Sequence, residues 1–370
     1  MNVLGIINFE DDSAKIDGLG DYRPVPAISF MGRYRIIDVI LSNMTNSGID
    51  NLLVFAKEKP RNLYAHLSDG TMYNINSKRG SLRILYGEKP FSSPIYNTDV
   101  ANFNLNLQYI EEDTNPYVLI APSKFIYNFD FNDALKQHIE SKADITVLYT
   151  STNEAKDRFL SCDVIQLDKE KRITSFEKNR GKNKSKQVSM EAYILSKALF
   201  IQLIKQAGDI SSLYWFKDIL HDQVNDLVIK GYGVRGYVAC IDSLREYYRV
   251  SMELKNPNSA EQVFKEDRPI YTQTVNSSPT LYTSDADVKD SVLANGSLIE
   301  GTVEGSILGR NVTIKQGAVV KNSIILTDAV IDKDAKLDYV IVDKYAIVHH
   351  IKKLEGTEEA PVYVKRRDRI

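Results

Sequence analysis

The C-terminal third of the chain carries a short apolar repeat that few folds can accommodate. Apolar residues recur there at intervals of five, six, six and six residues, at Ile307, Val312, Ala318, Ile324 and Val330. A six-residue recurrence of small or apolar residues, without a helical period, is typical of a parallel β-helix built from hexapeptide repeats. Inward apolar residues on each wall let stacked coils share one core. We therefore predict a hexapeptide β-helix over residues 285–370; a β-meander with coincidental spacing is the alternative.

The first 254 residues follow a different pattern, in which short apolar strands alternate with helices. Strand-like apolar runs lie at 2–7, 52–55, 117–121 and 145–149, and residues 36–46 and 132–142 have helical spacing. This alternation predicts βαβ units and a doubly wound, mostly parallel α/β sheet over residues 1–254. Ligands of such a sheet lie outside the carboxyl ends of its strands. The polar stretch 255–284 is expected to be a linker.

Composition and charge exclude several classes of protein. The chain has 370 residues, with 47 basic and 49 acidic side chains, so it lacks the basic surplus typical of nucleic-acid-binding domains. Two cysteines, Cys162 and Cys240, are too few for a disulfide scaffold or a Cys-rich zinc site. No apolar run approaches the roughly 20 residues that span a bilayer, and no signal peptide is evident. We expect a soluble, cytoplasmic protein that binds neither nucleic acid nor membrane.

Two strings in the first domain resemble a known enzyme family. The residues from Arg23 to Ala27, followed by those from Met31 to Asn43, resemble the N-terminal signature of glucose-1-phosphate adenylyltransferase (ADP-glucose pyrophosphorylase). Residues 236–254 resemble the last motif of that family's catalytic domain. The resemblance implies a nucleotidyltransferase-like domain followed by a left-handed parallel β-helix of hexapeptide repeats. It also implies transfer of an adenylyl group from ATP to glucose 1-phosphate, with release of pyrophosphate, in bacterial glycogen synthesis.

The segment that corresponds to the family's glycine-rich phosphate loop has lost its glycines. Residues 10–15 stand there instead and include the three carboxylates of Glu10, Asp11 and Asp12. The backbone amides of glycine residues can approach a triphosphate closely because no side chain intervenes, whereas carboxylates repel the triphosphate. A solvated surface loop is the alternative reading of these acids. Val25 also replaces a lysine of the family pattern. We expect weak or no binding of ATP.

The two family positions that supply aspartates to Mg²⁺ are also changed. They correspond here to Lys124 and Cys240, although Mg²⁺ requires hard oxygen ligands. We therefore assign no catalytic residue and no metal ligand to this chain, and expect no cofactor for it. Mg²⁺ is then bound by the active paralogue. Asp242 would share a face of an extended segment with Cys240 and is an alternative ligand.

The sugar-phosphate side of the family site is better preserved. The resemblance assigns a substrate-binding role to Arg23, Glu177, Lys178, Ser189 and Tyr193, with the lysine contacting the phosphate as a point charge. The family's glycine between the last two is replaced by Glu191. A solvated loop lysine is the alternative interpretation of Lys178.

These departures favour a regulatory-type subunit, catalytically weak or inactive, that assembles with a catalytic ADP-glucose pyrophosphorylase subunit. By analogy with the family, we expect this assembly to be a hetero-oligomer with four subunits. A sugar phosphate is a candidate effector. One alternative is an active glucose-1-phosphate adenylyltransferase that uses shifted ligands such as Asp242. A second is a hexapeptide-repeat acyltransferase, which lacks a well-placed histidine because only His349 and His350 lie in that domain. The basic string from Lys365 to Arg369 is interpreted as a frayed terminus.

Overall fold

The computed structural model describes residues 2–9, 14, 16–57, 59–75, 78, 80–87, 94–350 and 352–370. Its N-terminal domain is built on a sheet of nine strands, ordered β10-β9-β11-β6-β1-β4-β5, with β8 between β11 and β12. The strands are β1 (Val3–Asn8), β4 (Asn51–Phe55), β5 (Ser81–Leu85), β6 (Tyr117–Pro122), β8 (Ile145–Thr152), β9 (Asp163–Leu167), β10 (Ile173–Lys178), β11 (Lys186–Ser196) and β12 (Ile229–Val234). Strands β6, β1, β4 and β5 are parallel, whereas β11 runs antiparallel to its three neighbours.

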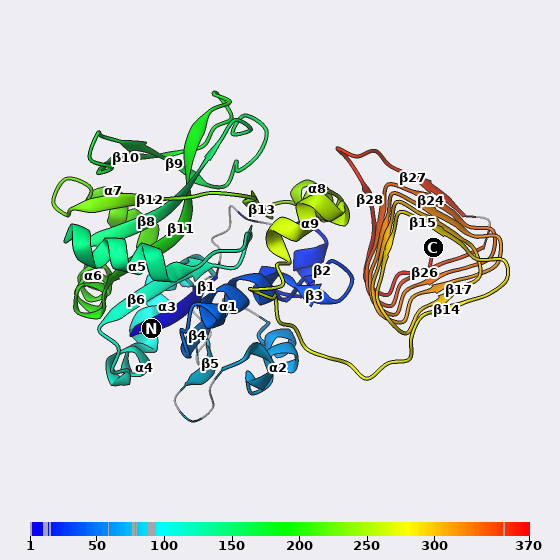
Figure 1. Ribbon diagram of the computed structural model, residues 1–370, viewed down its shortest axis with the longest axis horizontal. Helices are drawn as coiled ribbons and strands as arrows, with labels where there is room; N and C mark the ends of the chain where they lie inside the picture. The colour runs from blue at the N-terminus through cyan, green and yellow to red at the C-terminus, as the bar shows by residue number, and fades with distance from the viewer. Residues whose placement is uncertain are drawn as a thin grey trace.

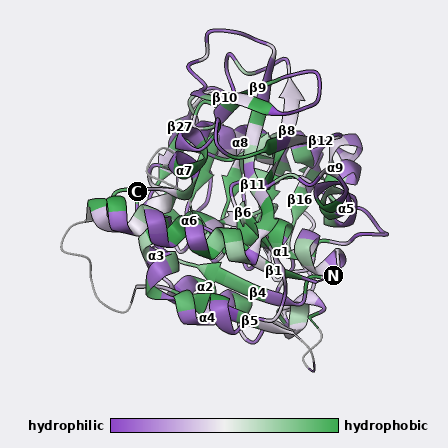
Figure 2. Ribbon diagram, turned by 90° about the vertical axis from the view of Figure 1, so that its left-hand side faces the viewer, coloured by the Kyte–Doolittle hydropathy of each residue, from purple (hydrophilic) through white to green (hydrophobic). Residues whose placement is uncertain are grey.

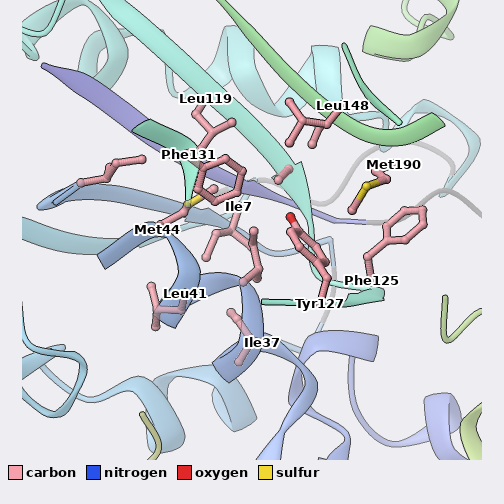
Figure 3. Close-up of a cluster of buried hydrophobic side chains, with 14 of the residues drawn as sticks. Ile7, Ile37, Leu41, Met44, Leu119, Phe125, Tyr127, Phe131, Leu148 and Met190 are labelled. Atoms are coloured by element: carbon pink, nitrogen blue, oxygen red, sulfur yellow. The ribbon is translucent and has the colours of Figure 1, made fainter. Parts of the chain in front are cut away.

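Helices cover both faces of this sheet (Figure 1). They are α1 (Ile36–Asn46), α2 (Arg61–Leu67), α3 (Asp99–Leu105), α4 (Leu107–Glu112), α5 (Phe131–Ser141), α6 (Lys197–Ile210), α7 (Phe216–Asp222), α8 (Leu244–Lys255) and α9 (Pro257–Val263). Helices α1, α2 and α5 share one core cluster with the sheet, whose side chains Figure 3 shows. Helices α3, α6 and α7 share the cluster on the opposite face. In Figure 2, β4, β6 and β11 carry the hydrophobic colour while α6 shows both colours, as expected for a buried sheet between amphipathic helices.

Helix α1 illustrates how the sequence sets these elements. The Asp38 side chain accepts a hydrogen bond from the Arg35 backbone N–H (2.8 Å), which satisfies a free donor at the helix start. Gly48, just past the end, has φ 76°, where glycine is favoured. Ile37, Ile40 and Leu41 are buried. The helix predicted over residues 36–46 is confirmed.

The C-terminal domain is a parallel β-helix with three walls of five strands each. The first wall contains β14 (Leu281–Tyr282), β17 (Leu298–Ile299), β20 (Thr313–Ile314), β23 (Val330–Ile331) and β26 (Ile347–Val348). The second wall contains β15 (Asp287–Lys289), β18 (Thr302–Glu304), β21 (Val319–Lys321), β24 (Lys336–Asp338) and β27 (Lys353–Glu355). The third wall contains β16 (Val292–Leu293), β19 (Ile307–Leu308), β22 (Ile324–Ile325), β25 (Val340–Val342) and β28 (Val362–Val364).

The β-helix prediction is confirmed, but not every residue of the predicted repeat points inward. Val312 and Ala318 belong to the core of the coils. Ile307 and Ile324 instead join the cluster that the third wall forms with α8 of the N-terminal domain. Val330 lies on the first wall, is only partly buried, and belongs to none of the core clusters formed by the described residues. A six-residue period therefore locates the coils without distinguishing inward from outward positions.

The two domains are joined by a broad contact rather than by a free tether. The predicted linker 255–284 contains α9, which Asn256 caps and Pro257 begins, and ends in β14. The Tyr248 hydroxyl on α8 donates to the backbone oxygen of Asn322 on the β-helix (2.5 Å). Figure 1 shows β28 on the side of the β-helix that faces α8. None of the described helices is long and apolar enough to cross a membrane.

Candidate functional site

Among the described residues, a small hollow lies at the carboxyl ends of β1 and β6, where ligands of such a sheet are expected. Asn8 at the end of β1 and Pro122 at the end of β6 line this hollow with Asp99, Tyr193 and Trp215. Its volume is about 20 Å³, enough for roughly one water molecule. Phe9 packs edge-on against Trp215, with ring centroids 5.8 Å apart, at the same place.

Asp99 is the buried carboxyl of this hollow. It accepts hydrogen bonds from the Asn8 side chain (2.8 Å) and from the backbone N–H groups of Val100 (2.7 Å) and Phe216 (2.9 Å). Burial nevertheless raises the pKa of Asp99 to about 7, because desolvation outweighs these donors.

Lys124 and Cys240, which the resemblance assigns to the two family metal positions, lie side by side. The short strand β7 (Phe125–Ile126) pairs with β13 (Ala239–Cys240), and Phe125 is the register partner of Cys240. Lys124 is only 1% exposed, and its Nζ lies 2.7 Å from Oε1 of Glu191. Burial opposes the charge on Lys124, but the carboxylate of Glu191 raises its pKa well above the ordinary value. A fixed ammonium with its own counter-ion therefore occupies this position.

Glu191 reaches Lys124 from a bulge in β11. The register of β11 against β8 shifts between Ser189 and Ala192, and Glu191 has φ 51°. A non-glycine residue is uncommon in this region, where the family pattern has glycine. The two departures from the pattern, Lys124 and Glu191, are thus partners in one ion pair, which sequence reasoning treated separately.

The donor set around Lys124 does not fit Mg²⁺. Cys162 and Cys240 lie with their sulfurs 3.7 Å apart. Burial raises the pKa of Cys240 well above its usual range, which keeps the thiol neutral. Asp242 accepts two hydrogen bonds from Ser161, from Oγ (2.7 Å) and from the backbone N–H (3.2 Å). Among the described residues, no three His, Cys, Asp or Glu side chains are placed to hold a metal ion.

The five predicted sugar-phosphate residues are not all brought together. Ser189 and Tyr193 are buried on β11, on either side of the bulge. Glu177 and Lys178 are exposed at the end of β10 and line a separate basic hollow of about 360 Å³ with Arg180, Lys182 and Lys186. Arg23 lies apart from all of them, as described below. Residues 10–13 and 15 of the expected phosphate loop lie outside the described residues; Ala14 is buried.

His221 and Asp163 form a contact between β10 and the surroundings of the Lys124–Glu191 ion pair. The sequence analysis did not anticipate this contact. The His221 ring stacks on Phe176 of β10, with centroids 5.1 Å apart, and its Nε2 lies 3.1 Å from Oδ2 of Asp163. Burial opposes the charge on Asp163, but His221 and the nearby cations Lys217 and Lys124 lower its pKa. No local sequence pattern links His221 to Asp163, 58 residues away.

Arg23 reaches into the interface between the domains. Its Nη2 lies 2.8 and 2.6 Å from the two carboxylate oxygens of Asp343, which is fully buried. The Tyr363 hydroxyl donates to the same carboxylate (2.8 Å). Asp343 follows β25 of the third wall, so this buried pair joins the N-terminal domain to the β-helix.

A cluster of cations surrounds this pair and was missed by sequence reasoning. Each domain contributes three members: Arg23, Arg33 and Arg35 from the first, and Arg310, Lys344 and Arg366 from the second. Burial and the neighbouring arginines lower the pKa of Lys344 to about 7. Within the described residues, one buried nitrogen each of Arg23, Arg310 and Arg366 has no hydrogen-bond partner. The arrangement favours a bound anion.

The string from Lys365 to Arg369 contributes to this cluster and is not a frayed end. Arg366 lies over the rings of Tyr22 and Tyr345, at 5.9 and 5.7 Å from their centroids. Arg369 forms an isolated bridge with Ile347 of β26. The strand β28 immediately before the string fixes it against the coils. The basic composition of this string was the available signal in the sequence. Only the fold shows which of its cations lie near the pair of Arg23 and Asp343.

Comparison with known proteins agrees with both domains. The nucleotidyl transferase family model matches residues 15–232, and the GlmU-like C-terminal hexapeptide model matches residues 279–358. The glycogen biosynthesis protein GlgD of Bacillus subtilis is 30% identical over 98% of this chain and 96% of its own length. The glucose-1-phosphate adenylyltransferase of Geobacillus stearothermophilus is 31% identical over 80% of this chain and 77% of its own length. The chain belongs to the glucose-1-phosphate adenylyltransferase family.

A second GlgD protein is also similar to this chain. GlgD of Geobacillus stearothermophilus is 34% identical over 86% of this chain and 82% of its own length. The family match confirms the resemblance drawn from residues 23–43 and 236–254. It also places the chain among proteins of glycogen biosynthesis.

Proposed function

We propose that this chain is a regulatory subunit of ADP-glucose pyrophosphorylase with weak or no activity of its own. It would modulate the synthesis of ADP-glucose from ATP and glucose 1-phosphate by a catalytic relative. The observation that carries the proposal is the buried ion pair of Lys124 with Glu191 at the metal position. The similarity to GlgD supports the same assignment.

The electrostatics of that ion pair disfavour a metal-dependent reaction. Glu191 neutralises Lys124 already, so the pair has no charge deficit for Mg²⁺ to fill. Asp242, the ligand of the alternative active enzyme, accepts its hydrogen bonds from Ser161 instead. We therefore favour the regulatory role.

The cation cluster between the domains supports a sugar phosphate, or another phosphate-bearing anion, as effector. An anion bound there would contact both domains and so couple its binding to their packing. Because the pKa of Lys344 is about 7 in the free protein, we expect anion binding at pH 8 to take up as much as about one proton. Calorimetric titration with inorganic phosphate in two buffers measures this uptake. Arg366→Gln should weaken the binding, and Lys365→Gln, at an exposed neighbour, should not.

The first coil of the β-helix supports assembly with the catalytic subunit. Leu281 and Tyr282 of β14 are 62% and 52% exposed, and the strand has a partner on one side only. Such an edge is normally covered or paired, so residues near 281–350 are candidates for the subunit contact. Deletion of the β-helix would not test this, because its third wall packs on α8. A point substitution such as Tyr282→Glu tests the subunit contact and leaves the third wall in place.

The proposal is tested by mixing purified chain with a catalytic glucose-1-phosphate adenylyltransferase from the same source. Alone, the chain should release no pyrophosphate above background from ATP, Mg²⁺ and glucose 1-phosphate. In the mixture, the turnover or the effector response of the catalytic enzyme should change, and light scattering should detect a mixed oligomer. Tyr282→Glu should reduce both effects, and Lys353→Glu on the exposed second wall should not. Separate elution with unchanged kinetics at micromolar concentrations would rule out the regulatory role.

A further inference from the structure

An apolar hollow of about 380 Å³ lies between the last turns of α6 and the short helix α7. Leu203, Ala207 and Ile219 line it and are buried, whereas Ile210, which also lines it, is 71% exposed. Figure 1 shows both helices on the side of the N-terminal domain away from the β-helix. This hollow shares no lining residue with the one at the strand ends, so it is a separate feature of the molecule.

The sequence of α6 explains why the hollow is left open. Leu203 and Ala207 are four residues apart and therefore lie on one face of the helix. The small side chain of Ala207 follows the larger one of Leu203 on that face, and α6 ends three residues later, at Ile210. A methyl group thus stands where a larger apolar side chain would fill the space against Ile219 of α7.

The charged side chains that line this apolar hollow are both acidic. Asp209 and Asp222 line it together with Tyr214, whose hydroxyl donates to Oδ2 of Asp222 (2.6 Å). Within the described part of the chain, neither carboxylate has an ion-pair partner. Lys205, one turn before Asp209 on α6, pairs with Glu111 instead, at 2.9 Å. The hollow therefore combines an apolar lining with an uncompensated negative charge.

We propose that this hollow binds a small organic cation, with a hydrocarbon part between the two helices and an ammonium group at Asp222. Sites for small molecules typically have volumes of about 300–1,000 Å³, apolar walls and a few polar groups. Burial of the hydrocarbon supplies affinity, and the carboxylates of Asp209 and Asp222 select the sign of the ligand's charge. A peptide helix would require a groove along several turns, whereas α7 has only 7 residues.

Helix α7 connects the hollow to the buried polar groups of the domain. Its residue Asp222 lines the hollow, while the backbone N–H of Phe216 at its other end donates to the buried Asp99 (2.9 Å). Trp215, immediately before the helix, packs edge-on against Phe9 at the strand ends. A ligand between α6 and α7 therefore contacts the same helix that reaches the hollow at the carboxyl ends of β1 and β6.

The fluorescence of Trp215, the only tryptophan of the chain, reports binding because this residue begins α7 and follows Tyr214. Titration of the full chain with hexylammonium at pH 7 and low salt should change the emission, with a dissociation constant of about 1 mM. Hexanoate, of equal length and opposite charge, should bind at least about tenfold more weakly. Hexanol should fall between them.

Two substitutions separate the charge from the apolar lining. Asp222→Asn keeps an acceptor for the Tyr214 hydroxyl and should weaken hexylammonium binding by about fivefold, without changing hexanol binding. Asp226→Asn is the matched control, because this exposed acid does not line the hollow, and should change neither. Ile210→Ser should weaken both ligands by about threefold. Circular dichroism confirms that each variant is folded.

The proposal fails on any of three results. They are no saturable binding of hexylammonium up to about 20 mM, equal affinity for hexylammonium and hexanoate, and an Asp222→Asn variant that binds hexylammonium like the wild type. Calorimetric titration of the same samples gives each dissociation constant independently of fluorescence. All of these measurements use the chain alone, so their outcome is distinct from the test of the regulatory role, which requires the catalytic enzyme.

Discussion

At the scale of single residues, two substitutions relative to the family pattern act as one unit. Lys124 and Glu191 are 67 residues apart in the chain, yet their side chains lie 2.7 Å apart in a nearly dry position. A buried pair of this kind is costly to break from one side, because the remaining charge has no partner, whereas replacing both members is close to neutral. Glu191 also holds a backbone conformation that suits glycine. The pair therefore explains both departures.

Lys124→Met should lower the free energy of unfolding by about 3 kcal/mol, because Glu191 is left as an unpaired, mostly buried charge. Adding Glu191→Gln should recover most of that loss. Lys136→Met is the matched control, since Lys136 and Glu140 are 73% and 66% exposed, and should cost less than about 0.5 kcal/mol. Urea unfolding measures all three. Equal losses for Lys124→Met with and without Glu191→Gln would show that the pair is not the cause.

Asp99 gives the protein a defined pH dependence. Its folded-state pKa of about 7 lies above that of an unfolded aspartate. The folded chain therefore holds a proton that the unfolded chain has lost, and stability should fall as pH rises from about 4 to about 7. Asp99→Asn should remove about 1 kcal/mol per pH unit from this slope. Unfolding free energies at pH 5 and pH 7 for both proteins provide the test, and identical slopes would contradict it.

At the scale of elements, the short hairpin of β2 (Ser29–Phe30) and β3 (Tyr34–Arg35) fixes the β-helix to the first domain. Gly32 in its turn has φ 74°, and a Cβ there would lie 2.9 Å from the backbone oxygen of Leu308 in β19. Only glycine combines that conformation with so close a backbone approach. Arg23 and Asp343 add a buried ion pair to the same interface. The two domains should accordingly unfold together.

Gly32→Ala should destabilise the chain by roughly 2 kcal/mol, through backbone strain and the contact with Leu308. Gly20→Ala is the matched control, because a Cβ there meets nothing within 4 Å, and we expect it to be neutral or slightly stabilising. Thermal unfolding followed by circular dichroism measures both. A single transition that moves only for Gly32→Ala agrees with coupled domains. Two separate transitions would contradict the coupling.

Elements with a regular period could be predicted from the sequence, whereas long-range partners could not. Residues 36–46 form α1, and the helix expected over 132–142 is α5, because apolar spacing reports which face of a helix is buried. The six-residue repeat likewise predicted the β-helix. Its assignment of Ile307 and Ile324 was less successful, because apolar residues also cover the wall that meets the other domain.

The functional contacts have no such period. Arg23 and Asp343 are separated by 320 residues, and nothing in either local sequence selects the other. The resemblance to the family singled out Lys124 and Cys240 as two positions of one site, and the structure places them beside each other where β7 pairs with β13. The resemblance could not indicate that the negative charge of Glu191 compensates the positive charge of Lys124. That relation depends on a bulge in β11 and on the burial of both side chains.

At the scale of the whole molecule, the nucleotidyl transferase scaffold is retained, and the described residues combine a buried ion pair with exposed surfaces on the β-helix. A hollow of about 20 Å³ lies at the ends of β1 and β6, the cation cluster lies between the domains, and the β-helix exposes the edge of its first coil. Coupling to another subunit requires differential contacts at a distant site. The buried ion pair and the exposed coil edge are both consistent with the proposed subunit that acts through its partner.

Equilibrium dialysis of ATP against the purified chain, with and without Mg²⁺, tests the central claim most directly. A catalytic glucose-1-phosphate adenylyltransferase dialysed in parallel serves as the positive control. Because Lys124 and Glu191 already neutralise each other at the metal position, we expect no Mg²⁺-dependent binding of ATP to this chain at micromolar concentrations. Micromolar affinity that requires Mg²⁺ would contradict this expectation and favour an active enzyme with shifted ligands.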